Sequence, residues 1–244
     1  GTTDHAYRCQ TCYNNKRGCL GHPGHVHMNY PVWNGIALEE ARKWLKLICF
    51  KCGKPIISET HYSRLPRAKR LDGAAKIART SVKKCVHCHT LHPIVKKDPA
   101  EPLSLIATIM EDKRQIDRWV IYPHMAGEIL SRVDADTVVK LGKSVLSHPE
   151  HMVLWDIQVP PVTIRPDVKK MGSGRSTNDD LTTMLQILIK KNDTMPSVIP
   201  TIIDQKLEKA IFDLNNAYYD FIKASGDDAM NSIASRLKGK MGRF

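Results

Sequence analysis

Long apolar stretches are scarce in this 244-residue sequence. The longest runs are short, as in 103–110, which Ser104 and Thr108 interrupt, whereas a membrane-spanning helix needs about 20 apolar residues. The first five residues contain no apolar segment of the kind that a signal peptide requires. We therefore expect an intracellular protein in a reducing environment, without a membrane partner.

Cysteine is absent after residue 88, and all seven cysteines lie at or before that position. An odd number of cysteines in a chain without a secretory signal argues against a framework of disulfides. It favours reduced thiolates that hold metal ions. One histidine added to seven cysteines gives eight ligands, which is the number that two four-ligand sites need.

Acidic residues are few in the first part of the chain. Residues 1–97 contain 18 lysines and arginines and 5 acidic residues, a balance of +13, whereas residues 98–244 contain 19 and 20, a balance of −1. The sum is a formal net charge of +12. This uneven excess favours a polyanionic partner that binds the first part of the chain. A solvated basic surface is the alternative.

Four pairs of potential metal ligands share one two-residue spacing and form two groups. A C-x2-C turn places two thiolates close together, and a second pair completes the tetrahedral shell that zinc prefers. Four protein ligands leave no open position for a substrate, so both sites are expected to be structural. His25 or His27 could replace His22 in the first group. The expected ligands of two Zn²⁺ ions are Cys9, Cys12, Cys19 and His22 for the first site, and Cys49, Cys52, Cys85 and Cys88 for the second.

No complete catalytic motif is present in the sequence, so no catalytic residue is expected. Cys85-Val-His-Cys88-His89 also fits the attachment motif of c-type haem, but that chemistry needs an exported protein and would leave the pair at 49–52 without partners. Gly142-Lys143-Ser144 resembles the end of a phosphate-binding loop that lacks its first glycine. Asp134 and Asp136 fit a helix cap better than a magnesium site.

The periodicity of apolar residues predicts an α+β fold that is mainly helical and has a small β element. Loops are expected at 1–34 and at 159–166, the latter because three prolines remove hydrogen-bond donors. Strands are expected at 103–110 and 116–122, joined by a charged turn. Helical segments are expected at 38–49, 64–84, 123–141, 148–154, 178–191 and 200–224, and the last two would form an antiparallel hairpin around 192–200.

The two C-terminal helices have the strongest helical pattern. The first is expected to be capped by Asn178 or Thr177 and to bury Leu181, Leu185 and Leu188. On the second, apolar residues recur with a spacing of alternately four and three, which is typical of a coiled coil. These residues are Ile203, Leu207, Ala210, Leu214, Ala217 and Phe221.

The last residues of the chain, 236–244, combine cations with glycines and contain no acid. Glycine lets a backbone approach a ligand closely, and cations suit phosphates. The four cations, Arg236, Lys238, Lys240 and Arg243, therefore suit the phosphates of a ligand, although a frayed basic tail fits the same composition.

Several of these motifs together resemble one family. Arg8-Cys-Gln-Thr-Cys12, Cys19-Leu-Gly-His22-Pro-Gly-His25 and Tyr30-Pro-Val32 are similar to the first zinc region in the largest subunit of DNA-dependent RNA polymerases of the eukaryotic, archaeal and large-DNA-virus type. The four-cysteine site follows in the order of that family. The residues at 159–166 and 178–182 resemble its proline-rich segment, its lid loop and the start of its coiled coil.

The resemblance continues at 236–243, which are similar to the opening of the family's template-contacting hinge. Two features depart from the pattern: Met241 stands where the family has an acidic residue, and the rudder-like segment at 225–235 is short. The general divergence favours a viral member, similar to the African swine fever virus type. For a viral protein the resemblance implies the host cytoplasm and the virion, and for a cellular eukaryotic one the nucleus.

The resemblance implies the clamp of such a polymerase, which closes over DNA and the DNA–RNA hybrid and contacts the second-largest subunit. A lid at about 165–177 would help to separate RNA from template, and the hairpin tip at Asn192, Asp193 and Thr194 would dock transcription factors. The parent enzyme is a nucleotidyltransferase that uses Mg²⁺ and an aspartate triad. The triad is missing here, so the chain is expected to be part of a longer protein.

Five divisions follow from the resemblance. They are a zinc-binding clamp region at 1–97, a mixed α/β clamp core at 98–158, a proline-rich segment with the lid-like loop at 159–177, a coiled-coil hairpin at 178–224 and a rudder-like loop with the start of the hinge at 225–244. A stand-alone zinc-dependent nucleic-acid-binding adaptor is the alternative, which accounts for the charge and the zinc sites but not for the later segments. A zinc hydrolase would need an open-shell site that neither cluster supplies.

Overall fold

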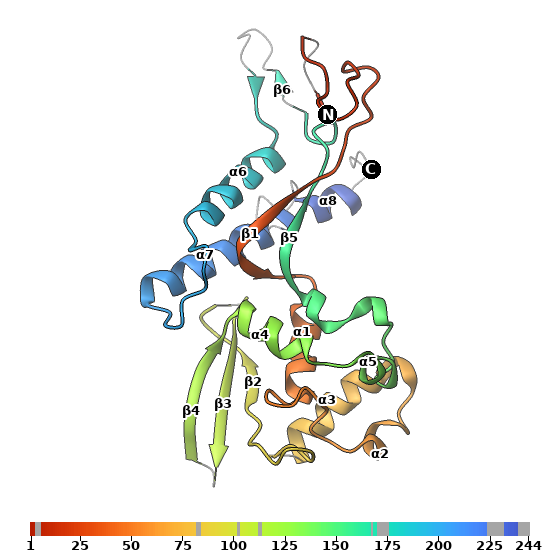
Figure 1. Ribbon diagram of the computed structural model, residues 1–244, viewed down its shortest axis with the longest axis vertical. Coiled ribbons are helices and arrows are strands. Elements are labelled where there is room, and N and C mark those ends of the chain that lie inside the picture. The colour runs from red at the N-terminus through yellow and green to blue at the C-terminus, as the bar shows by residue number, and fades with distance from the viewer. Residues whose placement is uncertain are drawn as a thin grey trace. The chain divides into compact units, whose positions relative to one another are not determined.

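A computed structural model of the protein describes residues 1–2, 6–81, 84–101, 103–111, 114–166, 168–169, 176–223 and 232–238. The chain forms two compact units (Figure 1). Unit 1 combines residues 1–30 with 155–244, and unit 2 is the continuous segment 31–154. The chain leaves unit 1 within β1 (Gly24–Trp33) and returns within β5 (Val153–Val159), and these two strands pair in a two-stranded sheet.

Helix α1 (Leu38–Leu47) lies at the centre of unit 2. Its apolar residues recur every three or four positions, and Trp44 and Leu45 are completely buried. Helix α1 contacts α3 (Arg70–Ser81), α4 (Pro123–Ser131) and the strand β2 (Ile94–Lys97). The remaining helical elements of the unit are α2 (Glu59–Tyr62), α5 (Ala135–Lys140) and three 3-10 turns at Arg67–Lys69, Val145–Ser147 and Pro149–Met152.

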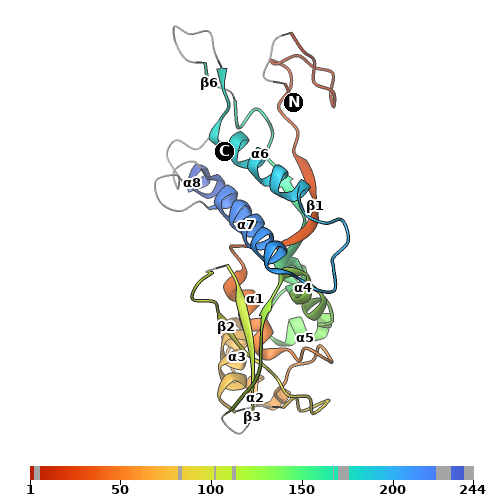
Figure 2. The same cartoon turned by 90° about the vertical axis from the view of Figure 1, so that its left-hand side faces the viewer.

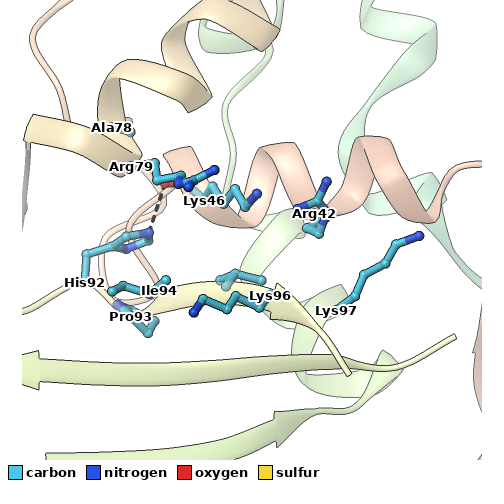
Figure 3. A pocket seen from close by; sticks show the side chains of 10 residues that line it. Arg42, Lys46, Ala78, Arg79, His92, Pro93, Ile94, Lys96 and Lys97 are labelled. Carbon is cyan, nitrogen blue, oxygen red and sulfur yellow. Dashed lines mark hydrogen bonds between the residues drawn. The ribbon is translucent and has the colours of Figure 1, made fainter. Parts of the chain in front are cut away.

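The sheet of unit 2 has three antiparallel strands in the order β2-β3-β4, with β3 at Leu105–Glu111 and β4 at Arg114–Ile121. Leu105 and Ile121 pair at the buried end of the β3–β4 hairpin, whereas most of β4 is exposed. A ring nitrogen of His92, Nε2, donates a hydrogen bond of 3.1 Å to the carbonyl oxygen of Lys46 (Figure 3). This bond fixes the segment before β2 to the end of α1.

Two helices of unit 1, α6 (Asp180–Asp193) and α7 (Gln205–Ile222), pack against each other and run in opposite directions (Figures 1 and 2). On α6 the buried leucines are the three that the sequence predicts. On α7 the buried residues are Ile211, Leu214, Asn215, Tyr218 and Phe221, whereas Leu207, Ala210 and Ala217 are only half-buried. The short helix α8 (Ile233–Lys238) contacts α7, and β6 (Val168–Lys169) pairs with β7 (Ser176–Thr177).

The secondary structure confirms most of the predicted elements: the helix after residue 38, the β3–β4 hairpin, two short helices after Pro123 and the helix pair of unit 1. Asp134 caps α5 by accepting a hydrogen bond of 2.6 Å from the backbone N–H of Thr137, as expected. Helix α6 is capped by Asp179 rather than by Asn178 or Thr177. Helix α7 begins five residues after the predicted start at Pro200, because Asp204 supplies its N-cap.

Three predictions of local structure differ from the structure in part or in full. Residues 24–33 form β1 instead of a loop, because Val26, Met28, Tyr30 and Val32 alternate along one face of the strand. The helical turn predicted for 148–154 ends at Met152, where β5 begins. The basic helix predicted for 64–84 is interrupted, since Pro66 precedes a 3-10 turn and α3 starts only at Arg70.

The units also cut across the predicted divisions, because residues 1–97 belong partly to unit 1 and partly to unit 2. Each unit contains one of the two predicted zinc clusters. The architecture is a mixed α and β fold, and the coiled coil and the clamp arrangement stay predictions. Among the described residues, no helix is both long and apolar enough to cross a membrane.

Candidate metal centres

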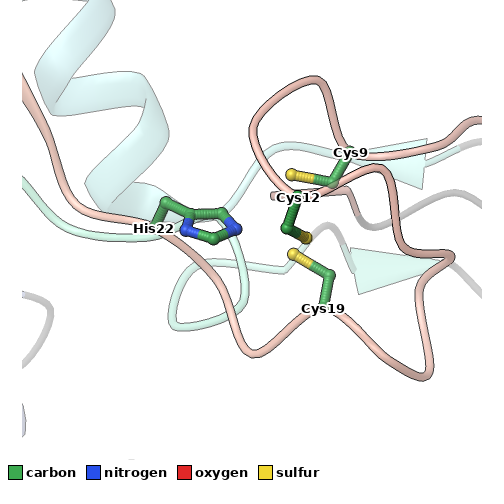
Figure 4. Close-up of side chains that lie close together, drawn as sticks. All are labelled: Cys9, Cys12, Cys19 and His22. Atoms are coloured by element: carbon green, nitrogen blue, oxygen red, sulfur yellow. The ribbon is translucent and has the colours of Figure 1, made fainter.

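The first cluster lies in the loop that precedes β1. The ligand atoms of Cys9, Cys12, Cys19 and His22 all lie within 4.8 Å of one another (Figure 4). Cys9 and Cys19 are buried, and no cysteine of the chain forms a disulfide. The ring nitrogen Nε2 of His22 is buried without a hydrogen-bond partner in the described part of the chain. A buried nitrogen beside three thiols is a donor set that fits a zinc ion.

This geometry distinguishes between the three histidines that the sequence leaves open. His22 lies with the thiols, whereas Nδ1 of His27 lies 3.0 Å from the carboxylate of Asp156, at an exposed position. His25 is exposed and is not part of the cluster. Of the three, His22 therefore fits the fourth ligand position.

The proline-rich segment at 159–166 packs against the loop that carries the first cluster. The hydroxyl of Thr163 donates a hydrogen bond of 3.3 Å to the carbonyl oxygen of Leu20. Gly21 has a φ of +92°, and a Cβ atom there would collide with the side chains of Thr163 and Pro161. The close approach therefore requires glycine next to His22. Two motifs that are about 140 residues apart in the sequence thus form one structure.

The second cluster lies in unit 2 and consists of Cys49, Cys52, Cys85 and Cys88, whose sulfur atoms also lie within 4.8 Å of one another. The distance between sulfur atoms is 3.4 Å for Cys49 and Cys88 and 3.7 Å for Cys52 and Cys85. A tetrahedral Zn²⁺ ion with bonds of about 2.3 Å places its sulfur ligands about 3.8 Å apart. The four thiols are therefore spaced close to what zinc requires.

A common backbone turn positions the three C-x2-C pairs. In the turn that starts at Cys49, the backbone N–H of Cys49 donates to the carbonyl of Lys54 at 2.8 Å, and the N–H of Gly53 donates back to Cys49 at 3.0 Å. The turns that start at Cys9 and Cys85 repeat both bonds with distances of 2.8 or 2.9 Å. The residue after the second cysteine has a positive φ in each turn, namely +57° at Tyr13, +71° at Gly53 and +56° at His89.

Positive φ at two residues other than glycine is informative. This conformation is unfavourable for Tyr13 and His89, so the surrounding contacts must hold it in place. In each turn a backbone N–H points at a cysteine sulfur, as at Thr11 for Cys9 and at His87 for Cys85, both at 3.4 Å. These donors favour a thiolate over a thiol.

The thiols of the two clusters differ in their pKa values. A hydrogen bond from the backbone N–H of Cys12 lowers the pKa of Cys9 to about 5, and the hydroxyl of Thr90 lowers the pKa of Cys88 to about 6. Burial raises the pKa of Cys49 to about 12. Several adjacent thiols cannot all ionise without a compensating charge, and a divalent cation supplies it. Both clusters could therefore hold a metal ion as closed four-ligand shells.

The other predicted site residues do not belong to the two clusters. Arg236 and Lys238 belong to α8, and Lys240 and Arg243 lie outside the described residues. Of the predicted lid at 165–177, the structure describes the two-residue strands β6 and β7 and the residues before β6 up to Pro166. At its start, the Arg165 guanidinium donates to the hydroxyl of Thr182 on α6 at 3.1 Å.

The predicted docking tip needs a correction. Asn192 is buried, because its side-chain oxygen accepts a hydrogen bond of 2.8 Å from the N–H of Asn29 and its amide donates to the carbonyl of His27 at 3.2 Å. The expectation that Asn192 belongs to an exposed tip is therefore wrong, and its side chain attaches α6 to β1. Asp193 and Thr194 are exposed. Their role in docking stays a prediction.

The sequence is similar to a group of known proteins that share one family. The family described as RNA polymerase Rpb1, domain 1, matches residues 1–244. A DNA-directed RNA polymerase RPB1 homolog of African swine fever virus is 39% identical over 227 residues, covering 91% of this chain and 15% of the viral protein. The Rpo1N subunit of Methanothermobacter thermautotrophicus is 29% identical, over 100% of this chain and 29% of the subunit. The DNA-directed RNA polymerase II subunit RPB1 of Euplotoides octocarinatus is 28% identical, over 100% of this chain and 57% of that subunit. The chain thus spans less than two thirds of each of these relatives.

Proposed function

This chain belongs to the family of RNA polymerase Rpb1 domain 1, and from this premise we propose that it is the clamp of the largest subunit of a DNA-directed RNA polymerase. In this role it closes over DNA and the DNA–RNA hybrid and contacts the second-largest subunit. The observation that carries the proposal is that the family match extends over all 244 residues of a chain that also brings eight metal ligands into two closed clusters.

Two structural Zn²⁺ ions belong to this proposal. The first would be held by Cys9, Cys12, Cys19 and His22, and the second by the four cysteines of unit 2. Zinc supplies a cross-link between distant turns, and a shell of four protein ligands has no position for a substrate. The Mg²⁺ of nucleotide transfer belongs to the parent enzyme, and no residue of this chain is assigned to catalysis. Reduced thiolates of this kind suit an intracellular protein.

The proposed contacts with partners lie in unit 1. The cations Arg236, Lys238, Lys240 and Arg243 would hold phosphates of the template strand, which positions DNA without reading its sequence. Transcription factors would dock at the end of α6 and the loop that follows it, where Asp193 and Thr194 are exposed. The side chains of Val198 and Ile202 in the same loop are 79% and 83% exposed, which supports a binding surface there.

The test uses the intact protein that contains this chain. Purification without chelator should give two zinc ions per chain by elemental analysis, and the second-largest subunit should co-purify. Replacing Lys238 and Lys240 together by Ala should reduce the slope of log affinity for duplex DNA against log salt by about 2. Lys206 and Lys209 of α7 are exposed, and their double replacement by Ala is the matched control.

The outcomes separate the proposal from a stand-alone adaptor. A protein that purifies without other polymerase subunits but still binds zinc and DNA would support the adaptor instead. An unchanged salt slope in the Lys238→Ala, Lys240→Ala variant would reject the assignment of the hinge contacts.

A further inference from the structure

A cavity of about 250 Å³ in unit 2 lies between α1, α3 and β2 (Figure 3). Six polar side chains line it, and no acidic residue does. Arg42 and Lys46 come from α1, Arg79 comes from α3, and His92, Lys96 and Lys97 come from β2 and the residues before it. The rest of the wall is apolar. Five cations around one cavity indicate a site for an anion.

Most of this positive charge is not neutralised by the protein. Arg42 and Lys97 share the carboxylate of Glu39, at 2.6 Å from the Arg42 guanidinium. Within the described residues, Lys46, Arg79 and Lys96 have no carboxylate at ion-pair distance. Lys46 of α1 and Arg79 of α3 line the same cavity (Figure 3).

Electrostatics within the cavity disfavour these charges in the absence of a ligand. Lys46 is half-buried, and its pKa is lowered by burial and then by the neighbouring guanidinium groups of Arg42 and Arg79. Burial also lowers the pKa of His92 to about 4, so this ring is neutral near pH 7 and adds no charge. An anion among the cations would offset both the burial and the repulsion of Lys46.

We propose that this cavity binds a phosphate group of a nucleic-acid strand. The Arg79 guanidinium and the Lys46 ammonium, which lack ion pairs among the described residues, match the donors that phosphate needs, and Arg and Lys are its usual partners in proteins. The cavity is slightly smaller than the roughly 300–1,000 Å³ of pockets for drug-sized ligands, which suits a phosphate with part of its sugar. The apolar residues of the wall can pack against that sugar.

The inference adds a second phosphate contact, in unit 2, to the hinge contacts proposed for unit 1. The positive charge of the cavity indicates an anion site independently of the proposed function. Only the choice of nucleic acid as the source of the phosphate rests on the proposed function. Part of the excess positive charge of +13 in residues 1–97 therefore lies around this cavity.

Lysine footprinting on the intact protein tests the proposal locally. The protein is acylated with and without a single-stranded oligonucleotide, and mass spectrometry follows the modification of Lys46 and Lys96. Parallel samples contain inorganic phosphate or polyglutamate at equal concentrations of negative charge. We expect the oligonucleotide to slow the modification of both lysines at least about threefold at saturation, and to act at far lower concentration than inorganic phosphate.

A matched pair of variants assigns the effect to the cavity. Arg79→Gln should raise the oligonucleotide concentration that half-protects Lys46 about tenfold, the expected effect of losing one charge-assisted contact. Lys76→Gln removes one exposed charge from the same helix outside the cavity and should change that concentration less than twofold. Equal effects of the two variants would overturn the proposal, because they would show a diffuse field rather than a site.

The remaining outcomes separate this proposal from the proposed function. Protection of the lysines at 238 and 240 without protection of Lys46 and Lys96 would overturn the cavity site and leave the clamp assignment intact. Protection of the cavity lysines alone would support the site and count against the hinge contacts. Protection by polyglutamate or by inorganic phosphate, but not by the oligonucleotide, would overturn the nucleic-acid assignment.

Discussion

The two candidate metal centres use the same backbone turn in different surroundings. In unit 2, Cys49 and Cys85 belong to the hydrophobic core, and Cys52 and Cys88 pack against it. In unit 1, the ligands lie in a loop at 9–22 that is held by turns and by the proline-rich segment rather than by a helix or a sheet.

This difference indicates two uses of a metal. In the loop of unit 1, few apolar contacts are available, so metal binding must supply most of the free energy that orders the chain. In unit 2, the metal would join two turns that the core already brings together, and its removal would expose buried thiols within that core. Loss of a ligand should therefore have a local effect in unit 1 and a cooperative effect in unit 2.

Cys85→Ser is expected to have the largest effect. It removes a ligand and places a hydroxyl in the core of unit 2, where Cys85 is 1% exposed. We expect the free energy of unfolding of unit 2 to fall by more than about 4 kcal/mol, measured by denaturant titration with hydrogen exchange of the amides in α1 as a local probe. Full protection of α1 in this variant would show that the second centre is not part of the core.

Acid should also weaken unit 2 through His92. Burial holds its pKa at about 4 in the folded protein, below about 6.5 in the unfolded chain, so the unfolded chain binds more protons between these values. The stabilisation by the neutral ring is complete above about pH 6.5 and is lost as the pH falls toward 4, by about 3 kcal/mol in total.

His92→Gln provides the comparison for this prediction, since an amide can still donate to the Lys46 carbonyl and does not titrate. The difference in the free energy of unfolding between wild type and variant should decrease from pH 7 to pH 4. Any release of metal by acid affects both proteins, so a difference that is independent of pH would contradict the prediction.

Asn192→Ala tests how much unit 1 depends on single polar contacts. The substitution removes the two side-chain hydrogen bonds to Asn29 and His27 and leaves partly buried backbone groups without these partners. We expect a loss of about 2 kcal/mol in unit 1, measured as faster hydrogen exchange in β1 and α6. Asp193→Ala, at the exposed neighbouring position, should change stability by less than about 0.5 kcal/mol. Equal effects of the two substitutions would restore Asn192 to the exposed tip.

Cys12→Ser should have the smallest effect on overall stability and the sharpest local one. The zinc content should fall from two ions to one per chain, and hydrogen-exchange protection should be lost over 6–22. Because the two centres share no residues, the free energy of unfolding of unit 2 should change by less than about 0.5 kcal/mol. A larger change in unit 2 would show that the centres are coupled.

The sequence predicts the parts of this structure that are local. Pairs of ligands with two residues between them identify both clusters, because a tight turn needs no other part of the chain to bring the two members of a pair together. The helices α1 and α6 follow from their apolar periodicity. Strand β1 could also have been predicted, since Val26, Met28, Tyr30 and Val32 alternate, but Gly24 and Pro31 favoured a loop.

What the sequence does not predict depends on contacts between distant segments. From the sequence, Asn192 is expected to be a polar turn residue, because its hydrogen bond with the backbone of β1 depends on the fold. The choice of His22 among three histidines needs the fold of the loop. The cationic cavity needs α1, α3 and β2 to meet, and its cations are spread over 42–97 without any motif.

The discontinuity of unit 1 has a consequence for synthesis of the protein on the ribosome. Unit 2 is one uninterrupted segment that ends at Leu154, so all of its residues have been made before the second segment of unit 1, 155–244, begins. The loop at 9–22 has its four metal ligands from the start but must wait for Thr163 and Pro161 to support it. Domains fold as units while the chain grows, so unit 2 can complete its fold first and the nascent N-terminal strand β1 acquires its α6 partner last.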